Sequence, residues 1–319
     1  MRKECDAKMN IKPNAPLFRD PIFDGAADPT IIWNRKEKEW WIFYTNRRAF
    51  APKCGVSYVH GTDIGIASSS DFGKTWIYRG IACGLEFEPG RNTFWAPEII
   101  EVNGIYHMYV SYVRGIPCDW NQPRSIIHYT SRNLWDWKYE SKLKLSSEKV
   151  IDSCVCPLPD GRWKMWYKDE VNHSFSYSAY SRDLYEWTVG EAEITDCPHE
   201  GPNVFFFENK YWMITDVWKG LGVYVSDDTS SWKRCKNILF ESGERKDDGT
   251  MANHADVLVY KGRAYIFYFT HPEVSFEQRH DLEFKWEYRH RRSSLQVAEL
   301  IVKDGQLCCD RNHIEIDLE

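Results

Sequence analysis

The feature that most constrains this chain is a repeat in which a serine precedes a tryptophan by six residues. It occurs four times, beginning at Ser70, Ser131, Ser181 and Ser226. Each copy follows a short alternating run, and each run follows two aromatic-rich segments joined by a short polar turn. The turns VNG, PDG and YKG hold residues that β-hairpins prefer. One repeat therefore predicts a hairpin, a third strand and a tryptophan-bearing outer strand.

The unit recurs five times, at intervals of about 50–65 residues, which is typical of a β-propeller. We predict one all-β domain over residues 1–319: a five-bladed β-propeller with four-stranded antiparallel blades. A charged stretch at about residues 271–292 interrupts the fifth unit and is expected to be an insertion over one face. We expect the repeat tryptophans to lie far from the axis, in the core: Trp76, Trp137, Trp187 and Trp232.

Charge and hydropathy narrow the classes of partner. The net charge is −6 and no basic run occurs, which argues against nucleic acid and anionic membrane surfaces as partners. No apolar stretch is long enough to cross a bilayer. The opening residues lack the apolar centre of a signal peptide. The expected location is cytoplasmic, with export as the alternative if a leader once preceded this sequence.

The ten cysteines show no spacing that suggests a disulfide framework. Cys154 and Cys156 are expected on one face of a strand, and the adjacent Cys308 and Cys309 are poorly placed to chelate a metal. We expect reduced thiols in the core, with disulfides as the alternative.

Four acids and a histidine occur at the start of the first strand of successive units: Asp28, Glu98, Asp152, Glu200 and His254. The first strand of each propeller blade lines the central channel, so these residues are expected to converge at one mouth. Crowded carboxylates raise one another's pKa, which can keep an acid protonated near neutral pH. The alternative for any single member is a structural role, such as capping a turn.

In this order the motifs ADPTII, FWAPEI, the ID of the third unit, EGPNVF and the late histidine resemble glycoside hydrolase family 43, over about residues 16–310. The resemblance implies inverting hydrolysis with Asp28 as general base and Glu200 as general acid. Asp152 would raise the pKa of Glu200 and orient it. Two positions depart from the family, because Glu98 stands where aspartate is usual and Ser153 where proline is common.

Substrate contacts are expected from Glu98, Trp95, His254 and Arg291. Trp95 is the best candidate for stacking on a sugar. Trp33, Trp218, Arg47, Arg91 and Arg292 are further candidates around the mouth. The resemblance requires no cofactor, but it is compatible with a structural calcium ion in the channel near His254. The alternative is a core histidine.

The predicted function is an inverting exo-glycosidase that releases arabinofuranose or xylose from plant-type oligo- or polysaccharides, as an α-L-arabinofuranosidase or β-xylosidase does. One alternative is a family 117-like hydrolase of galactose or anhydro-galactose units. Another is a propeller that binds carbohydrate without catalysis.

Overall fold

The computed structural model describes residues 12–52 and 54–319, whose strands form five separate four-stranded sheets. Within every sheet the strands follow chain order and pair antiparallel. The predicted all-β, five-bladed β-propeller is confirmed. Residues 1–11, on which the expectation about a leader depends, lie outside the described residues.

The blades use consecutive strands, with the first strand of each at the centre. Blades 1 and 2 comprise β1 (Ala26–Asn34), β2 (Glu39–Asn46), β3 (Asp63–Ser69), β4 (Ile77–Ile81), β5 (Thr93–Val102), β6 (Ile105–Val113), β7 (Ser125–Ser131) and β8 (Lys138–Lys142). Blades 3 and 4 comprise β9 (Val150–Pro157), β10 (Trp163–Asp169), β11 (Phe175–Ser181), β12 (Thr188–Ile194), β13 (Glu200–Phe207), β14 (Lys210–Asp216), β15 (Leu221–Ser226) and β16 (Lys233–Arg234). Blade 5 comprises β17 (Asn253–Tyr260), β18 (Arg263–Thr270), β19 (Ser294–Lys303) and β20 (Gln306–Cys309).

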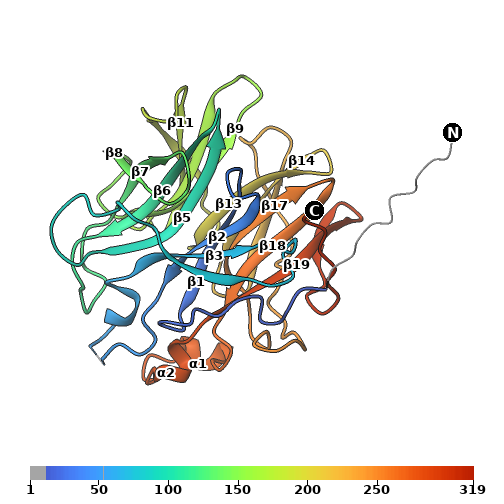
Figure 1. The fold of residues 1–319 in the computed structure, drawn as a ribbon. Helices are drawn as coiled ribbons and strands as arrows, with labels where there is room; N and C mark the ends of the chain where they lie inside the picture. The colour runs from blue at the N-terminus through green and yellow to red at the C-terminus, as the bar shows by residue number, and fades with distance from the viewer. Residues whose placement is uncertain (1–11, 53) are drawn as a thin grey trace.

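The ring closes through its inner strands. β1 contacts β5, β5 contacts β9, β9 contacts β13, β13 contacts β17, and β17 returns to β1 (Figure 1). Apolar side chains fill the space between neighbouring blades; Trp41 and Phe43 of β2, for example, share a cluster with Met108 and Val110 of β6. Burial of such faces is the main force that holds blades together.

Both end segments link blade 5 to blade 1. The amide of Leu17 donates to the carbonyl oxygen of Leu295 on β19. On the outer side, Ile316 and Leu318 are buried, and Nε1 of Trp40 on β2 donates to the carbonyl oxygen of Leu318. The first and last blades are thus joined by contacts from both directions along the chain.

The repeated serine closes the turn before each outer strand. The hydroxyls of Ser131, Ser181 and Ser226 each accept the amide three residues later. In blade 1 the equivalent residue is Ser69, one position earlier than the motif suggested, and it accepts the amide of Gly73.

The repeat tryptophans were expected within the outer strands. Instead, each stands one residue before its outer strand, at the end of the turn: Trp76, Trp137, Trp187 and Trp232. All four pack against the apolar clusters, as expected, although Trp187 and Trp232 are only half-buried.

The insertion in blade 5 forms two short helices, α1 (Phe276–His280) and α2 (Tyr288–Arg291), on one side of the ring (Figure 1). A single 3-10 turn, η1 (Ser57–Val59), lies in the long loop of blade 1. Within the described residues, no helix has the length and apolar character needed to cross a membrane.

Candidate active site

Each innermost strand contains a β-bulge near its start. In all five, the register shift leaves the inner strand with one residue more than its partner. The shifted segments contain Asp28, Ala96, Asp152, Gly201 and His254, and the first four have φ angles of 48°, 44°, 59° and 58°. A bulge bends a strand and re-aims a side chain, and left-handed backbone at non-glycine residues is typical of functional sites.

Three of the bulges carry the same sequence signal. Proline follows the bulge residue at Pro29, Pro97 and Pro202. Aligned in this way, Glu98 lies two residues after the bulge of its blade, and Glu200 lies one residue before. The expectation that all five residues stand at one equivalent position is therefore wrong for these two glutamates.

A cavity of about 500 Å³ lies over the bulges. Most of the expected site residues line it, including both proposed proton-transfer groups. From that set the lining residues are Asp28, Asp152, Glu200, His254 and Trp95. Asp28, Asp152 and Glu200, which are far apart in the sequence and lie in blades 1, 3 and 4, therefore line the same cavity.

Asp28 is fixed by Arg47 from the end of the blade-1 hairpin. One guanidinium nitrogen of Arg47 donates to both carboxylate oxygens of Asp28, at 3.0 and 3.1 Å. Asp28 is 5% exposed, and the guanidinium of Arg47 also rests on the ring of Phe269 at 4.7 Å. The carboxylate therefore has one orientation, toward the cavity that both residues line.

Asp152 and His254 meet at the centre of the site. Oδ2 of Asp152 accepts the amide of Gly201 at 3.1 Å, and Nδ1 of His254 lies 3.9 Å from both Asp152 and Asp28. Gly201 is required here, because a Cβ would lie 2.8 Å from the His254 ring. Burial raises the pKa of Asp152 to about 7, with His254 opposing the rise and Glu200 adding to it.

Glu200 is held by two nitrogen donors, one on each oxygen. Nζ of Lys168 lies 3.1 Å from Oε2, and Nε1 of Trp218 donates to Oε1 at 3.1 Å. Burial raises the pKa of Glu200, but the charge and hydrogen bond of Lys168, with Arg279 and His254, outweigh it and hold the pKa well below its ordinary value. The expectation that neighbouring acids raise the pKa of Glu200 is therefore wrong, because it took no account of Lys168.

Glu98 lies further along the inner strands and does not line the cavity. Its Oε1 accepts the amide of Val155 in blade 3 at 2.8 Å, and Asp256 accepts the amide of Ile31 in blade 1 in the same way. Burial and the charge of Asp256 raise the pKa of Glu98 to about 8. Glu98 therefore links blade 2 to blade 3, and its position does not support the expected contact with substrate.

Aromatic side chains form one wall of the cavity. Trp95 is 7% exposed, and its indole nitrogen donates to the carbonyl oxygen of Val59. Trp120, from the loop after β6, also lines the cavity and is 51% exposed, with its ring centroid 6.2 Å from that of Trp95. Trp120 therefore offers more surface for stacking than the predicted Trp95.

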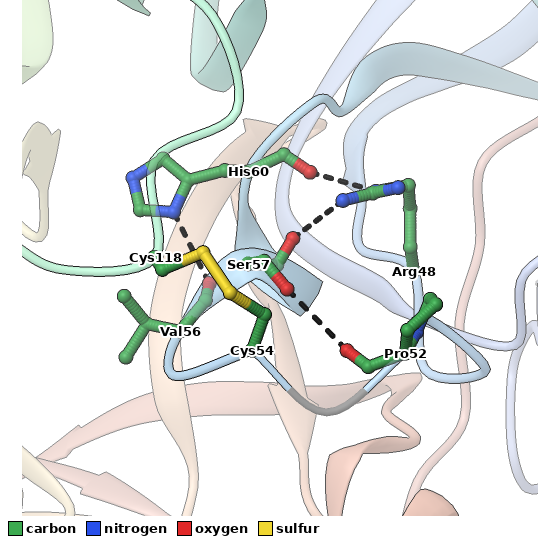
Figure 2. Close-up of a disulfide and its surroundings, with 7 residues drawn as sticks. All are labelled: Arg48, Pro52, Cys54, Val56, Ser57, His60 and Cys118. Atoms are coloured by element: carbon green, nitrogen blue, oxygen red, sulfur yellow. Dashed lines mark hydrogen bonds between the residues drawn. A yellow bond between two sulfur atoms is a disulfide. The ribbon is translucent and has the colours of Figure 1, made fainter.

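A disulfide ties this wall together. Cys54, in the blade-1 loop, is bonded to Cys118, two residues before Trp120 (Figure 2). Arg48 donates to the carbonyl oxygens of Ser57 and His60 in the same loop. The expectation of reduced cysteines is wrong for this pair. The other seven described cysteines are free, and Cys154 and Cys156 share the predicted strand face.

The blade-5 insertion forms another part of the cavity wall. It contributes Arg279, His280 and Trp286 to the cavity, and Trp286 stacks on Tyr58 of the blade-1 loop with centroids 6.3 Å apart. Arg291, an expected substrate contact, is 5% exposed and does not line the cavity. It donates to the carbonyl oxygen of Ala51 and lies over the ring of Tyr58. The structure therefore places Arg291 behind the wall as a support.

The other candidates divide between the cavity and the periphery. Trp218 and Arg47 line the cavity. Arg91 pairs with Asp63, Arg292 pairs with Asp247, and Trp33 packs on Trp40, all three away from it.

The structural calcium ion expected near His254 stays a prediction. Calcium–oxygen bonds are about 2.3–2.6 Å long and number six to eight. In residues 12–52 and 54–319, no three His, Cys, Asp or Glu side chains are placed to hold a metal ion. His254 lines the cavity with its side chain 15% exposed, so it is not a core histidine.

Sequence reasoning missed several residues of the site, chiefly Lys168, Glu170, Tyr58, Trp120, Arg279 and Trp286. Lys168 left a signal, because a lysine interrupts an apolar strand at a position whose neighbours predict burial. Trp120, Arg279 and Trp286 lie in loops and in the insertion, and no local pattern marks them.

Known proteins share this architecture. No protein-family profile matches the chain. Two curated proteins, each named a probable arabinan endo-1,5-alpha-L-arabinosidase A, from Aspergillus clavatus and Aspergillus fumigatus, are 25% and 24% identical over 175 and 172 residues. Each match covers 52% of this chain and 45% of the relative, so the chain spans about half the length of the curated relatives it matches.

Solved structures match over nearly the whole chain. A thermostable family-43 glycoside hydrolase superposes with a TM-score of 0.67 and 18% identity, covering 94% of this chain and 99% of that one. A family-43 β-xylosidase/α-arabinofuranosidase from a compost microbial metagenome, in complex with xylotriose, has a TM-score of 0.64 and 15% identity over 94% and 96%. The chain therefore has the five-bladed propeller fold that these family-43 glycoside hydrolases share.

Proposed function

We propose that this protein is a glycoside hydrolase that releases terminal sugars with inversion of configuration. The observation that carries the proposal is that Asp28 and Glu200, from blades 1 and 4, line one cavity with Asp152 between them in chain order. Hydrolysis by inversion needs one carboxylate to deprotonate a water and one carboxyl group to protonate the leaving oxygen. Such a pair stands about 6.5–9.5 Å apart, so that the water fits between base and sugar.

In this mechanism Asp28, oriented by Arg47, removes the proton from the attacking water. Glu200 gives a proton to the departing oxygen, and Asp152 exchanges protons with Glu200. General acid and base groups of this kind each contribute about 10²–10⁴-fold to rate. The exposed ring of Trp120 supplies an apolar face for a sugar, while Arg279 and His254 supply polar groups for hydroxyls.

The exo mode is supported by contacts that close one side of the cavity. Phe50 of the blade-1 loop stacks on Tyr288 of α2 with centroids 4.1 Å apart, next to the stacking of Tyr58 on Trp286. A chain end can enter such a cavity more easily than the middle of a polymer. The two curated relatives are named endo-acting, so the exo mode is our own proposal for this chain.

The names of similar proteins support a substrate class. Their printed names include β-xylosidase, α-arabinofuranosidase and arabinanase, and one complex holds xylotriose. We propose terminal L-arabinofuranose or D-xylose on plant-type glycans. The family 117-like activity on galactose or anhydro-galactose remains the second enzymatic candidate, and carbohydrate binding without turnover is the alternative of a different class. The Cys54–Cys118 disulfide favours an exported location over the cytoplasmic one.

The test is a product-release screen with plant and algal oligosaccharides, in which NMR follows the anomer formed first. Release of single pentoses with inverted configuration supports the proposal. Release of galactose units favours the second candidate. Tight binding by calorimetry with no product after long incubation would show a binding protein.

A further inference from the structure

The second strands of three blades hold the next blade in the same way. Thr45, Ser111 and Asp216 each pair with the residue just before their own bulge. Each accepts the amide of the bulge residue in the following blade, at 2.8, 3.0 and 3.0 Å. This position therefore has a structural task wherever it carries an oxygen.

Blade 3 departs from this pattern. The equivalent residue is Lys168, which pairs with Ile151 just before the bulge of β9. Lysine cannot accept an amide, and the amide of Gly201 donates to Asp152 instead. Lys168 is 4% exposed, so a buried ammonium group occupies the place of a neutral or anionic oxygen.

The ammonium group of Lys168 forms ion pairs with two carboxylates. Nζ of Lys168 lies 3.1 Å from Oε2 of Glu200 and 3.2 Å from Oε1 of Glu170. The other oxygen of Glu170 forms an ion pair with Arg124, whose Nε lies 3.1 Å away without a hydrogen-bonding geometry. Because Glu170 already lies within ion-pair distance, only a small movement of the Lys168 side chain is needed to pair it with Glu170 alone.

The hydrogen bonds of Glu200 conflict with its proposed role as a proton donor. Both oxygens of Glu200 accept hydrogen bonds from nitrogen, from Lys168 and Trp218, as an ionised carboxylate does. A proton donor to a leaving group must instead carry the proton on one of these oxygens. Some change on sugar binding has to free Oε2, and Lys168 is the group that occupies it.

We propose that Lys168 is a positioning residue that holds Glu200 ionised before a sugar binds and moves onto Glu170 when it does, which leaves Glu200 free to take up a proton. The inference rests on the proposed role of Glu200 as the proton donor. The proton comes from Asp152 through cavity water, so the total charge of the two carboxyl groups does not change. The guanidinium of Arg124 lies about 6 Å from the rings of Trp95 and Trp120, which links Glu170 to the aromatic wall.

Other charged groups also act on Glu200, and the test has to separate them from Lys168. They come from every element packed around it: Asp28 (β1), Arg47 (after β2), Asp152 (β9), Glu170 (after β10), Asp216 (β14), His254 (β17) and Arg279 (α1). None of these is changed by substitution of Lys168. Lys168→Met therefore isolates the contribution of the ammonium group.

The first experiment is a ¹³C NMR titration of the Glu200 carboxyl carbon, assigned by its loss in Glu200→Gln. We expect Lys168→Met to raise the pKa of Glu200 by at least one pH unit. Glu170→Gln should lower it, because Lys168 then loses its other nearby carboxylate partner. Lys168→Arg should leave it low, and saturating xylose or arabinose should raise it in the unaltered protein.

The matched control is Lys164→Met. Lys164 lies on the same strand, is 1% exposed and pairs with Glu193 at 2.5 Å, away from the cavity. It should not move the Glu200 titration. An unchanged Glu200 pKa in folded Lys168→Met, or a shift of the same sign in Glu170→Gln, would overturn the proposal. If Lys168→Met does not fold, Lys168→Gln removes the same charge with a polar side chain and takes its place in the titration.

A second readout is the alkaline limb of the kcat/KM profile, which should move with the NMR pKa in each variant. The NMR titration needs no turnover, so it remains valid if no glycoside is cleaved. Loss of all activity with the expected titrations would reject the proposed function but not the control of Glu200 by Lys168. If glycosides are cleaved but the Glu200 titration does not move in the variants, the proposed function stands and the control of Glu200 by Lys168 is rejected.

Discussion

Arg47 donates from a single nitrogen to both oxygens of Asp28, at 3.0 and 3.1 Å, and so defines the direction in which that carboxylate faces the cavity. We expect Arg47→Ala to lower kcat by about 10²-fold, because a displacement of about 1 Å of a catalytic group has that effect. Steady-state kinetics measure it. Arg35→Ala, which breaks an exposed ion pair with Glu101, is the control and should change kcat less than twofold. Equal losses in both variants would contradict the role of Arg47.

Glu200→Gln keeps the shape of the side chain and removes the proton. We expect a loss of about 10²–10⁴-fold with natural linkages, whose leaving groups need protonation. With dinitrophenyl glycosides the kcat of the variant should fall far less, because their leaving group departs without a proton. Comparison of kcat for the two substrates makes the measurement. A uniform loss with both would show that Glu200 is not the acid.

Trp120 presents its ring to the cavity, so Trp120→Ala should raise KM for oligosaccharides by about tenfold or more. Stacking of a nucleic-acid base on an aromatic ring contributes about 1–3 kcal/mol, and we expect a similar contribution from the apolar face of a sugar packed on an indole. kcat should change little, because the ring touches no reacting atom. Phe206→Ala is the control, since Phe206 is 52% exposed but lies outside the cavity. A fall in kcat at constant KM would contradict the role of Trp120 as a stacking surface for the sugar.

The disulfide closes a chain segment of 64 residues. In the chain-entropy account, a loop of this length stabilises the folded state by about 4 kcal/mol. The double variant Cys54→Ser/Cys118→Ser should therefore unfold at lower urea concentration and show a higher KM, because the loop carries Tyr58 and Val59. Cys83→Ser removes an exposed free thiol and should change neither. Unaltered urea midpoints in the double variant would contradict this.

A buried histidine pair makes the fold sensitive to acid. Nδ1 of His107 lies 3.0 Å from Nε2 of His128, and burial with the charge of His107 lowers the pKa of His128 to about 3. The unfolded chain binds this proton near pH 6.5, so the folded state loses stability as pH falls from 6.5 toward 3. The loss is about 2 kcal/mol at pH 5.

Urea unfolding at pH 7 and pH 5 measures this loss. His128→Phe, which can still stack on Tyr109, should reduce the difference between the two pH values. The same difference in wild type and variant would place the acid sensitivity elsewhere.

The sequence alone determined the architecture, because it depends on local patterns that repeat. Hairpin turns, alternating strands and the serine–tryptophan spacing recur in each unit and predict a blade without knowledge of its neighbours. The prolines after Asp28, Ala96 and Gly201 also mark the position of the bulge in the sequence. The prediction aligned the acidic residues instead of these prolines, and Glu98 was therefore misplaced. Asp28, Asp152 and Glu200 were found because first strands converge on the axis of any propeller.

Tertiary structure alone decided the state of the site. The pKa of Glu200 is lowered by Lys168, which lies 32 residues away in another blade. Charge interactions act through space between groups whose separation no local pattern encodes. The same holds for Trp120 and Arg279, which reach the cavity from a loop tied by a disulfide and from an insertion that packs on blade 1. Repeats specify the ring because they are local, but the chemistry at its centre depends on contacts between blades, which exist only once the ring has closed.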